Sequence, residues 1–519
     1  MSSQLFRCTG MAAKDYIRLM NAPSMVGLAS GPGATPSTLK AGVAARPMGY
    51  LEIAAWVAIA TVSFHVAYAG AMGSPLILLY VFAMAQLAGA STWRQRCYSG
   101  LAVGLLIAVF RLAFFWHIFS AGSVALWYVF AFWVGLFVGV AGLCLKKLGT
   151  VPGFVLMPFL WTGLEYFRSE CYYLKFSWLS PGYAFAGARG VVPVGFAGVY
   201  GVGFLLMSVA AAAAWRWRKS RMQGLTVLLV SGTCLWGLGP AGVRAPGQPG
   251  TVVRVAGIQM EHPAEAEVLA RLKALARRLP DTQLVVLSEY TFNEPIPVKV
   301  RQWCEQQHVY LVVGGTAPAP KSNFYNTAFV IGPDGEIVFQ QAKRVPIQFF
   351  KDGLPAPDQK VWESPWGKIG ICICYDLSYR QVMDRLIRLG VQALIVPTMD
   401  AAEWGRSQHE LHARIAPVRA AEYGVPIFRL ASSGISQLVD RSGRTLATAP
   451  YPGDGAILQG ELEIRGSGRL PLDQWLAPAS TLLAGLLVSS FALAALASRF
   501  RRPIPDSGPP ARRPGCSLS

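Results

Sequence analysis

The chain has 519 residues, of which 53% are hydrophobic and only 14% are charged, and its mean hydropathy is +0.37. Soluble domains carry about 25% charged residues, so this composition excludes an ordinary soluble enzyme. It also excludes a disordered chain, because a sequence this apolar and aromatic buries its surface. The net charge of +19 could indicate a nucleic-acid partner, but many basic residues border apolar segments, as they do in membrane proteins. We therefore expect membrane insertion and no nucleic-acid binding.

The nine cysteines are scattered along the chain and show neither a disulfide framework nor the spacing of a zinc site. Cys372 and Cys374 are the only closely spaced pair, and they lie in an apolar, strand-like segment. Residues 1–47 are polar and rich in small residues, and they lack the pattern of a signal peptide. We expect this segment to be a flexible cytoplasmic tail.

Eight stretches are long and apolar enough to cross a bilayer, which takes about 20 residues as a helix. They lie near 50–70, 75–92, 98–119, 122–145, 152–168, 190–214, 224–241 and 475–497. The sequence thus predicts a membrane domain of seven spans over residues 48–245 and a C-terminal transmembrane helix over 474–498. For the first two spans and the fifth, a re-entrant segment or one lying along the membrane surface is the alternative.

Basic residues follow every second predicted span, namely the second, fourth, sixth and eighth. They are Arg94, Arg96, Lys146, Lys147, Arg216, Arg218, Lys219, Arg221, Arg499, Arg501 and Arg502. Because short cytoplasmic loops are enriched in Lys and Arg, we expect both ends of the chain in the cytoplasm, including a basic tail over 499–519. The segment 250–470 is then expected on the opposite, extracytoplasmic side.

Glu165 and Arg168 stand three residues apart at the end of the fifth predicted span. This spacing lets opposite charges on a helix pair. Charge at membrane depth is usually functional or buried in protein. An interfacial ion pair that merely ends the helix is the alternative.

From Thr251 the pattern changes to short β-branched segments that alternate with amphipathic helices. We predict strands at 252–258, 284–287, 309–313, 327–331, 337–340, 369–373, 393–396 and 427–430, and helices at 265–279, 299–307, 379–389 and 407–423. This alternation predicts a single α/β domain over residues 250–470, with helices covering the sheet.

Three polar residues, Glu289, Lys343 and Cys374, each follow or end a predicted strand, where functional residues of open α/β folds gather. A thiol beside a lysine and at the start of a helix is expected to favour the thiolate. A carboxylate can move its proton, and a lysine can stabilise an oxyanion. Together they would support covalent acyl transfer without histidine. The alternatives are an inert buried cysteine, a role that we assign to Cys372, and solvated surface charges for the other two.

The sequence around these residues resembles a known superfamily. Ser288-Glu289, the run Lys343–Pro346 and the run Gly370–Asp376 look like the three signatures of the carbon-nitrogen hydrolase (nitrilase) superfamily. The resemblance implies an α-β-β-α sandwich and a catalytic Glu-Lys-Cys triad, made here of Glu289, Lys343 and Cys374. The Cys-Tyr-Asp context selects Cys374 over Cys372.

One branch of this superfamily, the apolipoprotein N-acyltransferase family, has membrane spans on both sides of the domain. The chain is similar to it in further segments, which are 164–168, 176–178, 198–202, 408–409, 419–422, Arg429 and 434–436. The resemblance implies a polytopic helical membrane bundle joined to an extracytoplasmic nitrilase-like domain. It also implies the inner membrane of a bacterium with two membranes, with the catalytic domain on the periplasmic side.

The family resemblance implies a reaction in two steps. Cys374 would take an acyl chain from a phospholipid as a thioester, and the α-amine of an apolipoprotein's N-terminal diacylglyceryl-cysteine would then accept it. Glu289 would act as general base and acid, and Lys343 would stabilise the oxyanion. The residues expected to shape the substrate pocket are Tyr375, Glu403, Trp404 and Gln348. No metal or organic cofactor is implied, and we expect a monomer.

The chain departs from the family pattern at Gln348, near which the family usually carries a second active-site glutamate. Gln348 can hydrogen-bond the lysine but carries no charge, so the pKa of the lysine could differ. The nearest substitutes along the sequence are Asp352, Glu294 and Glu403. Two other functions therefore stay open: a membrane-tethered nitrilase-type amidohydrolase that uses water as the acceptor, and a catalytically silent lipoprotein-binding homologue.

Overall fold

The structure is a computed structural model that describes residues 47–188, 193–237, 250–293 and 295–500. The predicted N-terminal tail up to residue 46, the basic tail after residue 500 and Glu294 lie outside these residues. The described residues from Pro47 onward belong to one compact unit. The domain limits proposed above, 48–245, 250–470 and 474–498, stay predictions.

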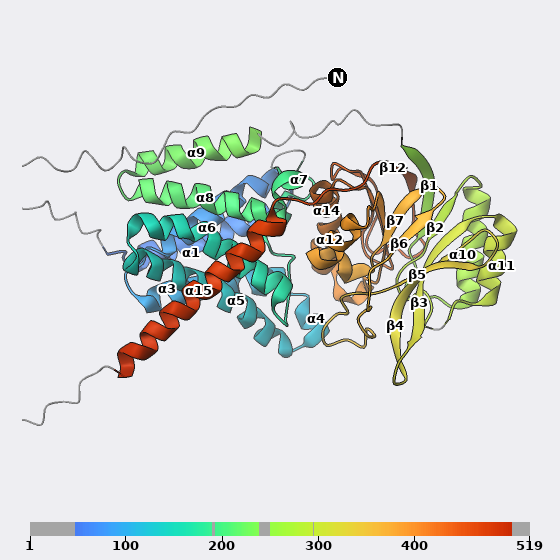
Figure 1. Ribbon diagram of the computed structural model, residues 1–519, viewed down its shortest axis with the longest axis horizontal. Helices are drawn as coiled ribbons and strands as arrows, with labels where there is room; N and C mark the ends of the chain where they lie inside the picture. The colour runs from blue at the N-terminus through green and yellow to red at the C-terminus, as the bar shows by residue number, and fades with distance from the viewer. Residues whose placement is uncertain (1–46, 189–192, 238–249, 294, 501–519) are drawn as a thin grey trace, which may run out of the picture. The chain divides into compact units, whose positions relative to one another are not determined.

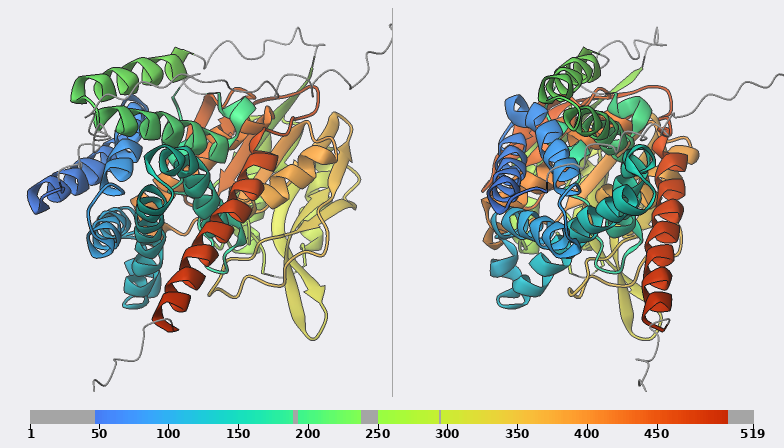
Figure 2. Two further views of the ribbon diagram at one scale, coloured as in Figure 1. Left: turned by 60° about the vertical axis from the view of Figure 1, so that its left-hand side comes forward. Right: turned by 90° about the vertical axis from the view of Figure 1, so that its left-hand side faces the viewer.

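Helices form at each of the eight apolar stretches (Figure 1). They are α1 (Tyr50–Ala67), α2 (Ile77–Leu87), α3 (Trp93–Arg111), α4 (Phe115–Phe119), α5 (Gly122–Lys147), α6 (Thr150–Tyr166), α7 (Val194–Ala197), α8 (Val199–Trp217), α9 (Arg221–Gly237) and α15 (Asp473–Phe500). The C-terminal helix α15 packs beside α6 (Figure 2). Four of the described helices, α1, α5, α8 and α15, are long and apolar enough to cross a membrane. The total of eight spans stays a prediction.

Glycines let α3 and α5 approach each other closely. A Cβ atom on Gly104 would lie 2.5 Å from the Cα of Ala131, and one on Gly100 would lie 2.9 Å from the Cα of Gly135. Small residues at such contacts bring helix backbones close enough for van der Waals packing to hold them together in a lipid environment. At its other end, α3 begins with a capping box in which the Thr92 side chain accepts a hydrogen bond from the backbone N–H of Gln95.

The second half of the chain folds into two six-stranded sheets. The first has the order β12-β1-β2-β3-β4-β5 and the second the order β11-β10-β9-β8-β7-β6. Strands of the first sheet are β1 (Thr251–Ile258), β2 (Leu284–Val286), β3 (Tyr310–Ala319), β4 (Asn323–Ile331), β5 (Ile337–Ala342) and β12 (Ile457–Ile464); those of the second are β6 (Val361–Ser364), β7 (Gly367–Ile371), β8 (Ala393–Thr398), β9 (Ile427–Ala431), β10 (Ser436–Val439) and β11 (Thr445–Ala449). In each sheet three central strands are parallel and the outer ones antiparallel.

Alternating side chains of the first sheet face in opposite directions. On β2, Leu284 and Val286 belong to the core shared with the second sheet, whereas Val285 packs with the helices α10 (Glu265–Arg278) and α11 (Val298–Gln307). The second sheet is covered in the same way by α12 (Arg380–Arg388) and α14 (Ile415–Tyr423). These layers form the α-β-β-α sandwich that the resemblance implied.

The predicted strands and helices of this domain are present, most with bounds close to those predicted, but β3 continues to Ala319, beyond its predicted end at 313, and one helix needs correction. The segment 407–423 is not one helix but two, α13 (Arg406–Ala413) and α14, separated at Arg414. Pro417 lies in the first turn of α14, and its missing N–H cannot bond to the carbonyl of Ala413, so a continuous helix would lose a hydrogen bond there. The strands β6, β10, β11 and β12 were not predicted.

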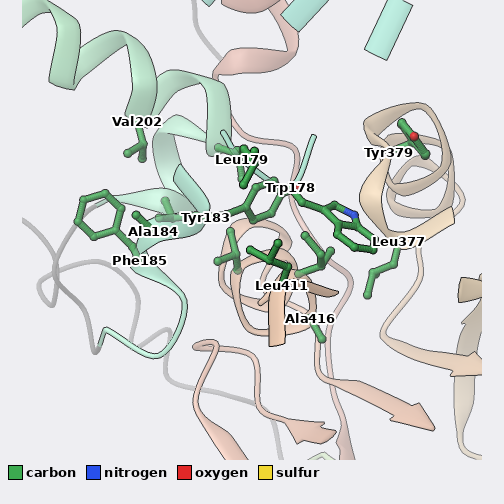
Figure 3. Close-up of a cluster of buried hydrophobic side chains, with 14 of the residues drawn as sticks. Trp178, Leu179, Tyr183, Ala184, Phe185, Val202, Leu377, Tyr379, Leu411 and Ala416 are labelled. Atoms are coloured by element: carbon green, nitrogen blue, oxygen red, sulfur yellow. The ribbon is translucent and has the colours of Figure 1, made fainter. Parts of the chain in front are cut away.

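The helical part and the sandwich share a buried apolar cluster (Figure 3). Trp178 and Tyr183, from the chain between α6 and α7, lie there with Leu377 and Leu411 of the sandwich. Polar contacts join the same surfaces, because Trp178 Nε1 donates to Ser378 Oγ at 2.9 Å. Residues of the helical part therefore pack directly against the sandwich, next to the ends of its strands.

Candidate active site

Glu289 lies just beyond the end of β2 and is 1% exposed. One carboxylate oxygen, Oε1, accepts hydrogen bonds from Asn326 Nδ2 at 2.6 Å and from Lys343 Nζ at 2.8 Å. The other, Oε2, accepts one from the backbone N–H of Met399 at 2.7 Å. Buried carboxylates need such partners, and here they fix both oxygens. Gly314, on the neighbouring strand β3, leaves room for the backbone of Glu289. A Cβ atom at position 314 would lie only 2.6 Å from the Cα of Glu289.

Lys343 directly follows β5, and its side chain is also 1% exposed. Its backbone N–H donates to the carbonyl oxygen of Asn326 at 2.7 Å, which fixes the start of the side chain. Its ammonium group lies 2.8 Å from Glu289 Oε1 and 2.8 Å from Asp352 Oδ2. A buried lysine with two carboxylate partners is held in a single position.

Asp352 therefore occupies the place of the second carboxylate that the sequence lacks at Gln348. Its oxygens also accept hydrogen bonds from Tyr290 Oη at 2.8 Å, from Asn326 Nδ2 at 2.8 Å and from the backbone N–H of Ile347 at 2.7 Å. Gln348 points elsewhere, since its Nε2 donates to the carbonyl oxygen of Tyr173 at 3.3 Å. The suggestion that Gln348 bonds the lysine is thus wrong, and Asp352 is the substitute.

The two carboxylates differ in their protonation behaviour. Burial raises the pKa of Glu289, and the negative charge of Asp352 raises it further, against the opposing effect of Lys343. Burial would also raise the pKa of Asp352, but Lys343 and the hydrogen bonds to this carboxylate hold it below its usual value. The two carboxylates more than offset the effect of burial on Lys343 and raise its pKa well above normal. Asp352 is thus the stable counter-ion of a charged lysine, and Glu289, whose pKa is raised, is the carboxylate that takes up a proton more readily.

Cys374 begins a short 3₁₀ turn, Cys374–Ser378, directly after the strand β7 and its extension. Its backbone has a φ of 51°, in the left-handed region that few residues other than glycine adopt. Such strain is typical of functional sites. The thiol lies 3.6 Å from the carbonyl oxygen of Met399. The backbone N–H of the same Met399 donates a hydrogen bond to Glu289 Oε2. Cys374 and Glu289 therefore contact the two backbone polar groups of one residue.

The thiol of Cys374 is protonated at rest. Burial raises its pKa well above the normal value, and the nearby Glu289 raises it further, so that the opposing effect of Lys343 is outweighed. The expected thiolate is not favoured overall: Lys343 does lower the pKa of the thiol, but burial and Glu289 outweigh it, and the turn is too short to provide a helix dipole. Cys374 therefore needs a base when it reacts. Cys372 is fully buried, as expected for an inert core residue.

Asp376 connects the cysteine turn to the lysine segment. Its carboxylate accepts hydrogen bonds from the backbone N–H groups of Val345 at 2.7 Å, of Arg344 at 3.1 Å and of Ile373 at 3.1 Å. Burial raises the pKa of Asp376 to about 6 despite these bonds. The acid in the Cys-Tyr-Asp motif thus holds the residues after Lys343 next to the residue before Cys374.

An apolar pocket with about 960 Å³ of empty space, including the part open to solvent, leads to Cys374. Its wall combines aromatic and aliphatic side chains of α4 and α5, and of the segments that follow α3 and α6, with residues of the sandwich. Tyr375, Trp404 and Gln348 line it, as predicted for substrate-pocket residues, and Tyr375 Oη also donates to the carbonyl oxygen of Lys175 at 3.1 Å. A pocket with this apolar lining suits an acyl chain.

A second, more polar pocket adjoins the first. It contains Glu289, Lys343, Asp352 and the predicted pocket residue Glu403, and it shares Trp404 with the apolar pocket. Two pockets therefore meet at the candidate site. The first is lined by the cysteine and mainly apolar side chains, and the second by the charged residues. Such an arrangement can receive a chain from one side and a polar group from the other.

Glu165 and Arg168 do not form the ion pair that their spacing suggested. Both lie in the described part of the chain, yet Arg168 Nη1 donates to the carbonyl oxygen of Phe176 at 2.7 Å, and its guanidinium lies over the ring of Phe130 at 5.0 Å. After Tyr166 the helix widens into a π-helical turn, Phe167–Cys171, which changes the direction of Arg168.

Sequence reasoning missed a buried polar cluster behind the site. Asp400 accepts hydrogen bonds from Gln408 Nε2 at 3.0 Å and Arg429 Nη2 at 2.5 Å, and it lies 2.8 Å from His412 Nδ1. Burial would raise the pKa of Asp400, but His412 and Arg429 hold it well below normal. Gln408 and His412 lie one turn apart on α13, but Asp400 and Arg429 come from other parts of the chain, so no local sequence pattern could have linked all four.

Comparison with known proteins gives matches to both halves of the chain. Residues 41–212 match the family model described as apolipoprotein N-acyltransferase N-terminal domain, and residues 254–464 match the carbon-nitrogen hydrolase model. An apolipoprotein N-acyltransferase of Geobacter metallireducens is 25% identical over 356 residues, which cover 59% of this chain and 68% of that protein. One of Shewanella oneidensis is 23% identical over 418 residues, which cover 70% and 80%.

Relatives of the sandwich alone also occur. The omega-amidase NIT3 of Saccharomyces cerevisiae is 29% identical over 224 residues, which cover 36% of this chain and 76% of that protein. The crystal structure of Saccharomyces cerevisiae Nit3, a member of branch 10 of the nitrilase superfamily, is 23% identical, with a TM-score of 0.35, and the match covers 41% of this chain and 90% of that one.

Proposed function

The chain belongs to the apolipoprotein N-acyltransferase family within the carbon-nitrogen hydrolase superfamily, and from this premise we propose that it moves an acyl chain from a phospholipid to a lipoprotein through a thioester on Cys374. The acceptor is the α-amine of the N-terminal diacylglyceryl-cysteine of an apolipoprotein. The observation that carries this proposal is the contact of Cys374 and Glu289 with opposite sides of Met399, at the end of an apolar pocket that also borders the helical part.

In the first step Cys374 attacks the carbonyl carbon of the phospholipid's ester. Glu289, as a carboxylate, takes the proton of the thiol while the C–S bond forms. The tetrahedral intermediate then breaks its bond to the glycerol oxygen, which receives the same proton from Glu289. A lysophospholipid leaves, and an acyl thioester remains on Cys374.

In the second step the neutral amine of the lipoprotein attacks the thioester carbonyl. Glu289 accepts a proton from the attacking nitrogen, the C–S bond breaks, and the proton passes to the departing sulfur. The products are an amide and the regenerated thiol. The raised pKa of Glu289 makes its carboxylate a stronger proton acceptor in both transfers.

Lys343 provides a fixed positive charge for the oxyanion of each intermediate. Its two contacts of 2.8 Å hold the ammonium group before substrate arrives, so little reorganisation is needed when charge develops. Asp352 keeps this lysine charged. Asp376 holds the lysine segment against the cysteine turn and is a positioning residue.

The apolar pocket favours transfer over hydrolysis. Aromatic and aliphatic side chains around Cys374 keep water from the thioester, while the acyl chain occupies the space. Both substrates are anchored in the bilayer by acyl chains, so they reach the site at high effective concentration. This requires the site to face the outer surface of the inner membrane, as the distribution of basic residues predicts.

The proposal is tested with the purified full-length protein, a phospholipid and a synthetic diacylated lipopeptide. Mass spectrometry should find the peptide with a third acyl chain in amide linkage, together with lysophospholipid. A Cys374→Ser protein should form neither product, whereas Cys372→Ser should retain activity. Release of free fatty acid without acylated peptide would instead identify a hydrolase, and normal activity of Cys374→Ser would refute the assignment of the nucleophile.

A further inference from the structure

Two arginines meet where the helical part contacts the sandwich, outside the site described above. Arg111 ends α3, and Arg414 separates α13 from α14. The guanidinium carbon of Arg111 lies 5.8 Å from the ring centroid of Tyr68, and that of Arg414 lies 5.1 Å from it. Segments about 300 residues apart thus bring two positive charges to one aromatic ring.

The end of α1 holds both guanidinium groups. Arg111 donates to the carbonyl oxygen of His65 and, through Nε, to Nδ1 of the same residue at 3.1 Å. Arg414 donates through Nη2 to the carbonyl oxygen of Tyr68. Because His65 Nε2 lies 3.3 Å from the carbonyl oxygen of Leu106, the imidazole donates there and accepts at Nδ1, which is the arrangement of a neutral ring. His65 positions Arg111 without altering the net charge.

Neither arginine has a carboxylate partner within the described ranges. Glu410, the carboxylate of α13, lies 3.6 Å from Arg406 instead. The Nη1 atom of Arg414 is buried and has no hydrogen-bond partner among the described atoms, although the side chain as a whole is only half-buried. Charge in such a place is costly without a counter-ion. Two neighbouring guanidinium groups that lack a carboxylate partner match the charge and the oxygens of a phosphate.

The position of the two arginines fits the acyl donor. Leu112, next to Arg111, and His412, two residues before Arg414, both line the apolar pocket that leads to Cys374. In the predicted topology, the C-terminal ends of α1 and α3 point toward the extracytoplasmic side of the membrane. A phosphate held there would leave its acyl chains beside the pocket.

We propose that Arg111 and Arg414 bind the phosphate group of the phospholipid acyl donor and so direct its ester toward Cys374. The inference rests on the proposed function, because it assigns the donor's head group to a place in the same reaction. Recognition is through phosphate chemistry, which a lipid head group and free phosphate share. The two sources are therefore separated in the test.

The test measures thioester formation on Cys374 with two acyl donors, phosphatidylethanolamine and p-nitrophenyl palmitate, the second of which has no phosphate. Full-length Arg111→Gln, Arg414→Gln and the double variant are compared with wild type. The readout is kcat/KM for the phospholipid divided by kcat/KM for p-nitrophenyl palmitate. This ratio should fall by about tenfold or more in each single variant, since a charge-assisted contact with the phosphate is lost. Arg111→Lys and Arg414→Lys should recover part of the ratio. Arg216→Gln, which removes an exposed arginine at the far end of α8, should leave it unchanged.

The ratio separates binding from folding, because a variant that merely loses structure reacts more slowly with both donors. An unchanged ratio in the double variant overturns the inference. Absence of a thioester in wild type with either donor refutes the proposed function instead. Inorganic phosphate is the second arm and should slow the wild-type phospholipid reaction no more than sodium chloride at equal ionic strength. Competition at micromolar phosphate that the variants lose, with phospholipid turnover intact, would show a free-phosphate site and contradict the lipid assignment.

Discussion

Asp352 and Glu289 share the ammonium group of Lys343, yet their environments assign them different tasks. Asp352 is held by three further hydrogen bonds to Tyr290, Asn326 and the backbone of Ile347, all of which favour its charged form. Glu289 is deeply buried, and the charge of Asp352 disfavours its ionisation. Asp352 therefore keeps Lys343 charged, whereas Glu289 can accept and return a proton.

This division predicts the pH dependence of an Asp352→Asn variant. Catalysis requires ionised Glu289, so the rate rises with pH through the raised pKa of Glu289. Removing the charge of Asp352 lowers that pKa, and the acid limb of the kcat profile should move to lower pH. The maximal rate should fall about tenfold or more, because Lys343 loses a charged hydrogen bond of about 1.5–3 kcal/mol.

Steady-state kinetics between pH 4 and 9, a range wide enough to include shifted carboxyl pKa values, checks this prediction. Asp358→Asn is the matched control, since Asp358 is an exposed aspartate and its ion pair with Arg385 is 3.8 Å long. A limb that moves to higher pH in Asp352→Asn, or an equal effect in the control, would contradict the assigned roles.

Gln348→Glu restores the glutamate that the family pattern would place near this position. Because Lys343 already has two carboxylate partners and Gln348 faces Tyr173, the added charge should change kcat by no more than about twofold. Initial rates with the lipopeptide measure this directly. A large gain would mean that Asp352 does not replace the missing glutamate.

The triad candidates could be selected from the sequence because each stands in a short motif after a strand. The partners that define their chemistry could not. Asp352 appeared among three possible substitutes, and only the fold of the segment after Lys343 brings it to the lysine. The resting state of Cys374 was mistaken for the same reason, since burial and the carboxylates around Lys343 are set by the tertiary structure.

At the scale of elements, the close contact of α3 with α5 has a measurable consequence. Gly104→Ala places a Cβ atom 2.5 Å from the Cα of Ala131, and the helices must separate to admit it. Overpacking of this kind costs about 1–3 kcal/mol, so the thermal unfolding midpoint in detergent should fall.

Gly485→Ala is the control for this substitution. Gly485 is also within a helix, but nothing lies within 4 Å of its added Cβ atom, so the midpoint should stay or rise slightly. Equal midpoints for Gly104→Ala and wild type would show that the two helices are not packed as described.

Elements with a strong period were predictable, and the short edge strands β6 and β11 were not. Buried β-branched strands such as β8 are continuous apolar runs, which explains their agreement with the prediction. β11 alternates between exposed and buried positions over five residues, and β6 has only four, so neither differs enough from a turn. The break at Arg414 was missed because the apolar pattern continues across it.

For the whole molecule, the predicted topology places the sandwich and the turn between α8 and α9 on opposite sides of the membrane. After replacement of the exposed Cys171 and Cys234, a single cysteine is introduced at Ser442 on the sandwich or at Lys219 beside that turn. In cells whose outer membrane is permeabilised, a membrane-impermeant maleimide should label Ser442→Cys and not Lys219→Cys. Labelling of Lys219→Cys alone would reverse the orientation and exclude a periplasmic reaction.

The membrane part and the sandwich act as one site in this account, because the pocket that ends at Cys374 has walls from both. Sequence composition predicted the two parts, and the helices and sheets agree with that prediction. Their joint surface was not predictable, since Trp178, Ser378 and their neighbours meet only in the folded chain.

The central claim is that Cys374 carries the acyl chain between donor and acceptor. The most direct measurement is the intact mass of the purified protein after incubation with phosphatidylethanolamine and no lipopeptide. We predict a mass increase of one acyl chain that maps to Cys374, is released by hydroxylamine and disappears when lipopeptide is added. An unmodified Cys374 in a protein that still acylates the lipopeptide would contradict the account.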